Sequence, residues 1–282
     1  MSGTLFVVAT PIGNLEDITM RALRVLREVR LIAAEDTRRT ARLLGRYAIE
    51  TPTTSLHQHN EAAKTSALLR RLQDGDDVAL VSDAGTPTLS DPGAHLIRTA
   101  IEAGIRVEPV PGPSAALAAL AGSGLDTTTF AFLGFPPTKL SDRKLWLAGL
   151  SAAGGTVIFF EAPHRIVGTL KQLLGSIGDC EVSIGRELTK KHEQFVRGPI
   201  SGVLKSLSDP IGEFTVVLSI GHKTENTELA APSPADLTSE LTRITAGGTL
   251  SRRRAIQQMA REHGMAPNDV YAAIEVAKKS VK

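Results

Sequence analysis

The stretch LFVVATPIGN, residues 5–14, joins a short apolar run to a turn that contains proline and glycine. An apolar run of this length, bounded by turn-forming residues, is typical of a buried strand in a parallel sheet. Helical patterns separate it from the runs that follow; in one, Ile18, Ala22 and Val25 recur at helical spacing. Strands that alternate with helices predict a parallel sheet with helices on both faces. The further apolar runs lie at 31–34, 53–56, 78–82 and 107–110.

The sequence also predicts where the chain divides. The flexible stretch AGSG, residues 121–124, predicts a boundary between a first α/β domain over 1–121 and a second over 122–222. The polar segment 223–234 is typical of a linker, and three short helical patterns follow over 235–282. The expected fold class is therefore α/β, with two α/β domains and a small C-terminal helical region. Strands of the second domain are expected at 130–135, 156–161, 181–186 and 213–220.

Composition excludes several classes of protein. With 42% hydrophobic and 22% charged residues in 282, the bulk of the chain is not disordered. No apolar run reaches the roughly 18 to 20 residues that a membrane helix needs, and no basic region precedes the first run as in a signal peptide. The single cysteine, Cys180, excludes an intramolecular disulfide framework and a cysteine-based zinc site. We therefore expect a cytoplasmic protein without membrane contact and without a metal site.

Three turns are the expected binding loops, because ligands of open parallel sheets bind beyond the carboxyl ends of the strands. They follow the first, fourth and fifth strands and read TPIGN (10–14), DAGTP (83–87) and PGPSA (111–115). Glycine allows close approach of the backbone, and proline stiffens it, which suits a flat, nucleoside-like ligand. Ordinary turn chemistry is the alternative for each loop taken alone. The fingerprints of dinucleotide and nucleoside-triphosphate sites are both missing from the sequence.

Charged residues gather at two expected strand ends of the second domain. Glu161 and Arg165 follow one strand, and Arg186, Glu187 and Lys190 follow another. Such a group is suited to acid–base chemistry or to anion binding, and an ion-pair network between domains is the alternative.

The C-terminal region carries a net charge of +3, from eight basic and five acidic residues over 235–282, whereas the rest of the chain carries −1. The arginines at 252–254 open an expected helix, where the helix dipole disfavours cations. An anionic partner is one interpretation, and two helices joined by a glycine turn are similar to a helix-turn-helix unit. A solvated helical cap is the other.

Long strings of the sequence resemble the tetrapyrrole methylase superfamily, and more closely its ribosomal small-subunit RNA methyltransferase I family. They occur in the same order and span both expected domains. The resemblance implies two α/β domains with a cofactor cleft between them. The strings are VATPIGNLEDIT (8–19), AAEDTRRTARLL (33–44), SDAGTPTLSDPG (82–93), PVPGPSAALAAL (109–120), FLGFPP (132–137), FFEAPHR (159–165), GRELTKKHEQFVRG (185–198) and GEFTVV (212–217).

The resemblance implies an S-adenosylmethionine-dependent 2′-O-methyltransferase that acts on a cytidine of 16S ribosomal RNA, at position 1402 in the usual RNA numbering, either in free RNA or in the small subunit. The family is usually dimeric. A C-methyltransferase of porphyrin or corrin precursors is the first alternative, and the basic tail argues against it. A non-catalytic RNA-binding or ribosome-assembly factor is the second, and the intact loops argue against that.

The resemblance also assigns roles to residues. It implies that the cofactor contacts Pro11, Gly13, Asp83, Ala84, Gly85, Thr86, Pro111, Gly112, Pro113, Ser114, Ala115, Phe160 and Leu188. A ribose hydroxyl needs a base to accept its proton, and the candidates are Glu161, Glu187, Lys190 and His192. As a base, Lys190 would need a strongly lowered pKa. The expected RNA contacts are Arg165, Arg186, Lys191, Arg197, Arg252, Arg253 and Arg254.

Overall fold

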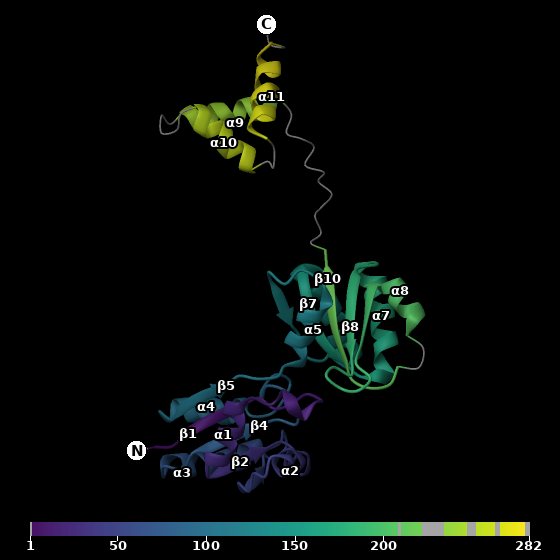
Figure 1. The fold of residues 1–282 in the computed structure, drawn as a ribbon. Helices are drawn as coiled ribbons and strands as arrows, with labels where there is room; N and C mark the ends of the chain where they lie inside the picture. Colours follow the sequence, from purple (N-terminus) through teal and green to yellow (C-terminus); the bar gives the residue numbers. More distant parts are fainter. Residues whose placement is uncertain (1, 208–209, 222–233, 247–251, 263–265, 280–282) are drawn as a thin grey trace. The chain divides into compact units, whose positions relative to one another are not determined.

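The computed structural model describes residues 2–207, 210–221, 234–246, 252–262 and 266–279. The chain divides into two compact units, Met1–His222 and Lys223–Lys282. The first unit holds two five-stranded sheets, and the second holds three helices (Figure 1).

The N-terminal sheet is parallel throughout, with the strand order β3-β2-β4-β1-β5. This order places β1 between β4 and β5, so the three strands that precede the expected binding loops are neighbours. The short apolar runs form these strands, as predicted. Their bounds are β1 (Thr4–Val8), β2 (Leu31–Ala34), β3 (Thr53–Ser55), β4 (Val78–Val81) and β5 (Arg106–Val110).

Helices cover both faces of this sheet because successive strand residues point to opposite sides. Ile32 and Ala34 pack in one apolar cluster with α1 (Met20–Glu28) and α2 (Thr37–Arg46). Leu31 and Ala33 pack in the opposite cluster with α3 (Glu61–Gln73) and α4 (Ala94–Glu102). A short helical turn, η1 (Leu15–Asp17), precedes α1.

The second sheet is mixed, with the order β6-β7-β10-β8-β9. Only the pair β6–β7 is parallel among the described strands of this sheet. The edge strand β9 was not predicted. The bounds are β6 (Phe130–Phe132), β7 (Gly155–Glu161), β8 (Glu181–Arg186), β9 (Gln194–Pro199) and β10 (Phe214–Ile220).

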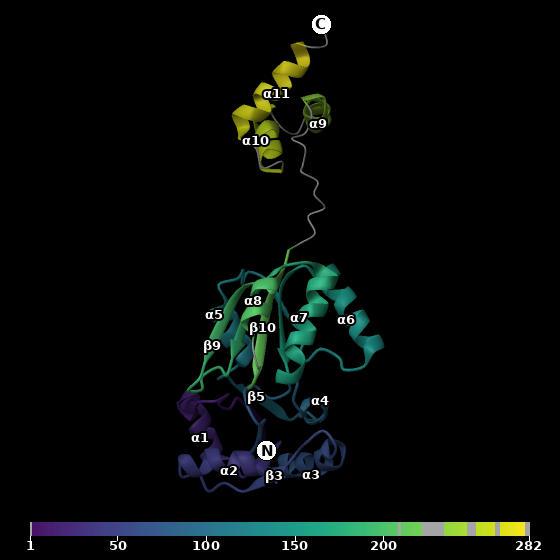
Figure 2. The ribbon, with the colours of Figure 1, turned by 90° about the vertical axis from the view of Figure 1, so that its right-hand side faces the viewer.

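Different helices cover the two faces of the second sheet. The helices α6 (Leu140–Ala153), α7 (Pro163–Ile177) and α8 (Ile200–Ser206) contribute to the apolar cluster on one face (Figure 2). On the other face α5 (Ala115–Ser123) packs its buried alanines and Leu120 against Ile158 and Val217. Thus α5, which runs across the predicted boundary at 121–122, packs on the second sheet.

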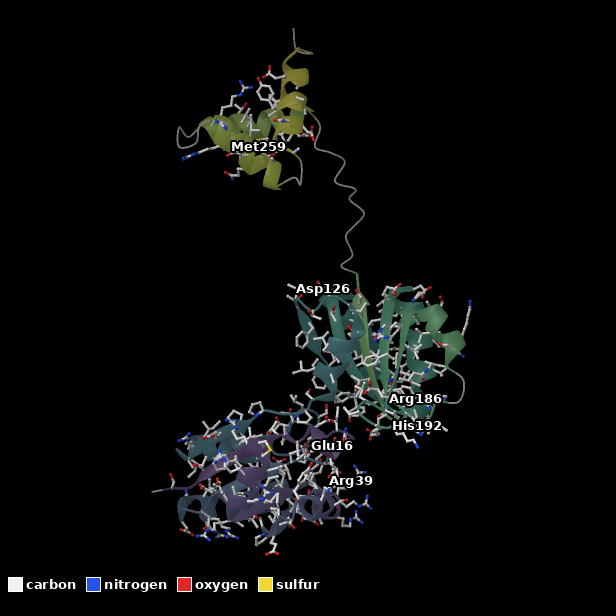
Figure 3. All side chains as sticks on the ribbon, viewed as in Figure 1. Glu16, Arg39, Asp126, Arg186, His192 and Met259 are labelled. Carbon is white, nitrogen blue, oxygen red and sulfur yellow. The ribbon has the colours of Figure 1, made fainter. Side chains whose placement is uncertain are left out.

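The second unit has its own apolar core. Leu237 from α9 (Pro234–Ala246), Met259 from α10 (Arg252–Glu262) and Ile274 from α11 (Pro267–Lys279) are buried together. Met259 is labelled in Figure 3. Residues 223–233 of the expected linker, and the glycines at 247, 248 and 264, lie outside the described residues. No helix in the described part of the chain is long and apolar enough to cross a membrane.

Candidate functional site

The loops after β1, β4 and β5 are joined to one another by hydrogen bonds. Thr10 and Gly85 exchange two backbone hydrogen bonds of 2.9 Å, and the Thr10 hydroxyl donates to the Ser82 carbonyl at 3.1 Å. The Thr86 hydroxyl donates to the Pro113 carbonyl at 3.4 Å. The three glycine- and proline-containing turns therefore meet at one edge of the sheet, as the sequence predicted.

These loops and the second sheet enclose a cavity of about 450 Å³, a size typical of small-molecule sites. Part of its lining was predicted: Asp83, Ala84, Gly85, Thr86, Ser114, Ala115, Phe160, Glu161 and Leu188. The other lining residues were given no role: Ile12, Glu35, Arg39, Leu89, Ser90, Asp91, Ala116, Phe135, Ala162, Pro163, Glu213, Phe214 and Thr215.

Five of the predicted cofactor contacts do not line the cavity: Pro11, Gly13, Pro111, Gly112 and Pro113. Pro11 is buried within the first loop, and Pro111 and Gly112 are exposed. The Pro113 carbonyl accepts the hydrogen bond from Thr86, which lines the cavity. Gly13 lines a neighbouring groove instead. These positions shape the loops rather than the cavity wall.

Two loops that line the cavity have strained backbones. Thr88 and Ser90 have φ angles of 74° and 71°, and Leu89 between them lines the cavity. Glu187 and Thr189 have φ angles of 51° and 65°, and Leu188 between them also lines it. Positive φ in non-glycine residues costs about 1–3 kcal/mol each and clusters at ligand-binding sites. Both leucines thus lie at the cavity wall between residues with strained backbones.

Three carboxylates gather at the end of the cavity nearest the N-terminal sheet, and two of them were not predicted. Glu35 accepts a hydrogen bond from the Asp83 amide at 3.2 Å, and Arg39 lies 3.2 Å from the Asp83 carboxylate. Burial, followed by the charge of Glu35, raises the pKa of Asp91 to about 6. Burial also raises the pKa of Glu35. The cavity therefore holds crowded acidic groups that a bound cation would stabilise.

Glu161, a candidate base, has a fully buried carboxylate that is surrounded by donors. It accepts hydrogen bonds from the Ala162 amide at 2.9 Å and from the Thr169 hydroxyl. The guanidinium groups of Arg143 and Arg165 lie 3.7 and 3.2 Å away. Because donors and guanidinium groups hold this carboxylate in place, the contacts favour a structural, positioning role at the end of β7.

Glu187 and Lys190, the other two candidates, form an ion pair of 3.1 Å beside the cavity. The Glu213 amide donates to Glu187, which together with Lys190 lowers the pKa of Glu187. Burial acts to lower the pKa of Lys190, but its hydrogen bonds to Glu213 and Glu187 outweigh burial and raise it. The lowered pKa that a basic Lys190 requires is therefore not found. His192 is exposed on the loop between β8 and β9 (Figure 3).

Three of the predicted RNA contacts are bonded within the fold. Arg165 donates to the Pro136 carbonyl at 2.6 Å as well as pairing with Glu161. Arg186 donates to the Ile211 carbonyl at 2.7 Å, and Arg197 donates to the carbonyls of residues 122 and 123. These arginines tie strand ends and loops together.

The other predicted RNA contacts are more exposed. Lys191 is exposed on the loop after β8. In the second unit Arg252 pairs with Glu275 at 2.7 Å, whereas Arg253 and Arg254 are exposed with no ion pair among the described residues. No group of three or more potential metal ligands occurs in the described part of the chain.

Comparison with known proteins agrees with this arrangement. The model of the family "Tetrapyrrole (Corrin/Porphyrin) Methylases" matches residues 4–204. Ribosomal RNA small subunit methyltransferase I of Escherichia coli O157:H7 is 42% identical over 274 residues, which cover 95% of this chain and 93% of that protein. The protein of the same name from Thermotoga maritima is 48% identical over 219 residues, which cover 77% of this chain and 98% of the relative.

Among solved structures, the fold is similar to uroporphyrin-III C-methyl transferase from Thermus thermophilus complexed with S-adenyl homocysteine. The TM-score is 0.56 at 19% identity, over 77% of this chain and 97% of that one. At this identity the likeness shows the fold alone. The family model and the relatives together show that the chain belongs to the tetrapyrrole methylase family and, within it, to the ribosomal RNA small subunit methyltransferase I family.

Proposed function

We propose that the chain is an S-adenosylmethionine-dependent methyltransferase of small-subunit ribosomal RNA, and that it methylates the 2′-hydroxyl of a cytidine, at position 1402 of 16S RNA. Support comes from the names of the relatives at 42–50% identity, combined with a nucleoside-sized cavity lined by carboxylates. A homodimer, which the resemblance implies, is part of the same proposal and is tested by light scattering.

The cavity residues suit this cofactor at both of its ends. Phe135 and Phe160 lie 5.4 Å apart between ring centres, and with Leu188 they offer an apolar wall to an adenine ring. Glu35, Asp83 and Asp91 outnumber the single cation, Arg39, among the residues that line the cavity. This acidic excess complements a ligand that carries a sulfonium and an ammonium group but only one carboxylate.

When bound, S-adenosylmethionine supplies a methyl group that is activated by the positive sulfur. The task of the protein is then to hold a ribose oxygen in line with that group, and positioning of this kind accounts for a large part of such rates. Glu161, through Arg165 and the start of α7, fixes the cavity wall at the end of β7. The Glu187–Lys190–Glu213 network fixes the loop that carries Leu188. The catalytic roles of Glu161, Glu187 and Lys190 stay predictions, and these contacts favour positioning.

Transfer of radiolabelled methyl tests the proposal. Small ribosomal subunits that lack the modification are incubated with the protein and labelled S-adenosylmethionine, and uroporphyrinogen is the parallel substrate. We expect label in the 16S RNA and, after nuclease digestion and mass spectrometry, a 2′-O-methylcytidine. Label on a base would overturn the 2′-O assignment, and label in uroporphyrinogen alone would favour the porphyrin-precursor enzyme. Cofactor binding in calorimetry without transfer to either substrate would favour the non-catalytic factor.

A further inference from the structure

The helix α2 carries an unusual charge. Its sequence, TRRTARLLGR, contains four arginines and no acidic residue. Arg38, Arg42 and Arg46 follow one another at four-residue spacing, so they share one face of the helix, and all three are exposed. Like charges at this spacing destabilise a helix by about 0.2–0.5 kcal/mol per pair. The helix therefore maintains a basic face at a cost to its own stability.

These charges are weakly compensated. Arg38 pairs with Asp36 at 2.7 Å, but its side chain remains 89% exposed. Within the described ranges Arg42 and Arg46 have no ion pair, and the Arg46 guanidinium lies over the Tyr47 ring, 6.0 Å from its centre. By contrast, Arg165, Arg186 and Arg197 are all bonded to the protein, as described above. The helix α2 thus carries a group of exposed and weakly compensated positive charges in the first unit.

The helix also connects the candidate active site to a second depression. Arg39 lines the cavity, whereas Arg46 lines a groove together with Gly13, Asn14, Glu16, Thr189 and Lys191. Figure 3 marks Arg39 on α2 and Glu16 on the segment after β1. Arg46 follows Arg39 by seven positions, which is about 10 Å along a helix axis.

Two pairs of consecutive residues lie between the cavity and the groove. Ile12 and Leu188 face the cavity, whereas Gly13 and Thr189 face the groove. The Asn14 amide donates to the Thr189 hydroxyl at 3.0 Å and holds this partition together. A polymer whose reactive unit meets the methyl donor at the mouth of the cavity would therefore reach the groove with its neighbouring units.

We propose that Arg38, Arg42, Arg46 and Lys191, here called the α2 basic surface, bind the phosphodiester backbone of the RNA whose ribose meets the methyl donor at the mouth of the cavity. The inference rests on the proposed function for the identity of the polymer. Exposed arginines bind phosphates without reading bases, so this surface supplies affinity and register rather than sequence recognition. Selection of the nucleotide that is methylated takes place at the cavity.

The test compares two double variants that lose the same charge. Arg42→Ala/Arg46→Ala removes two arginines of the α2 basic surface. Arg70→Ala/Arg98→Ala removes two exposed arginines from α3 and α4, on the opposite face of the sheet. Alanine favours helix formation, so α2 is retained, and unchanged S-adenosylmethionine affinity in calorimetry verifies the fold. Filter binding to unmodified small subunits is measured at several salt concentrations, alongside methyl transfer.

The salt dependence gives the expected magnitude. Each phosphate contact to single-stranded RNA adds about 0.7 to the slope of log affinity against log salt, so losing two lowers the slope by about 1.4. Between about 50 and 200 mM salt, the affinity deficit of the α2 variant should therefore shrink by roughly sevenfold. We expect a raised KM with little change in kcat, and near wild-type values for the α3–α4 control.

Equal behaviour of the two variants, or unchanged binding by Arg42→Ala/Arg46→Ala, would overturn the inference. These outcomes are distinct from failure of the proposed function, in which the wild type itself transfers no methyl group to any small-subunit RNA. The binding measurement needs no transfer, so it decides the role of the α2 basic surface in that case too. A wild type that does not bind the subunit would refute both.

Discussion

Glu161 provides the sharpest test of how the cavity wall is built. The substitution Glu161→Gln keeps the shape of the side chain but removes its charge, which leaves Arg143 and Arg165 without their shared carboxylate. The Glu161 side chain is 0% exposed, and those of the two arginines are 10% and 21% exposed. Breaking a buried ion pair from one side costs about 3–5 kcal/mol. For a unit of this size that corresponds to a fall of roughly 6–20 °C in thermal midpoint.

Urea and thermal unfolding, followed by circular dichroism, measure this loss, and Glu213→Gln is the matched control. Glu213 pairs with Lys190, but its side chain is 76% exposed, so we expect a cost below about 1 kcal/mol. The reasoning would be refuted if Glu161→Gln unfolded like the wild type while methyl transfer fell by about 10²–10⁴-fold, with loss of the acidic limb of the pH profile, where a general base becomes protonated. That combination would identify Glu161 as the general base.

Three further perturbations address other parts of the chain. The pKa of Asp91 is raised in the native state, so ionisation of this carboxyl destabilises the fold. The thermal midpoint of Asp91→Asn should therefore exceed that of the wild type above about pH 6. This difference should disappear as the pH falls toward 3.8, the ordinary value. The same variant should bind S-adenosylmethionine more weakly, and a pH-independent difference in melting would contradict the burial argument. Gly13→Ala places a Cβ atom 2.6 Å from the Lys190 side chain and should cost about 1–3 kcal/mol in urea unfolding, whereas Gly45→Ala meets no atom within 4 Å and should be neutral or stabilising. Met259→Ala should lower the free energy of unfolding of the C-terminal helices by about 2–5 kcal/mol and leave cofactor affinity unchanged. A single thermal transition in calorimetry would contradict the presence of two separate units.

The strands were predictable wherever both faces are buried. The run at 31–34 matches β2 residue for residue, because a central parallel strand is apolar throughout. The edge strand β9, with the sequence QFVRGP, buries little of either face and so carries no apolar run.

The site was predictable where backbone chemistry defines it. Glycine and proline residues predicted the three loops, and these loops lie at the ends of β1, β4 and β5. The carboxylate group was missed because Glu35 and Asp91 come together only when β2 and β4 pair. Both residues lie within quoted strings of the sequence, so the rule that ligands bind beyond strand ends would have found Glu35 once the strand order was known.

The partners of the arginines could not be predicted. Arg165 and Arg197 donate hydrogen bonds to backbone carbonyls of residues that are distant in the sequence. Since every residue has a backbone carbonyl, the amino-acid type does not indicate which one accepts. The arginines of α2 carry a local signal, since four of them occur without an acidic residue in one short helix. Such a charge pattern is readable from the sequence, whereas its proximity to the cavity requires the fold.

The most direct measurement is a crystal structure of the chain grown with S-adenosylhomocysteine. We expect density for the nucleoside in the cavity, with the sulfur-bearing chain beside Asp83 and the adenine against Phe160 and Leu188. Density at any other place on the first unit, or an empty cavity at saturating ligand, would contradict the assignment of this cavity as the methyl-donor site.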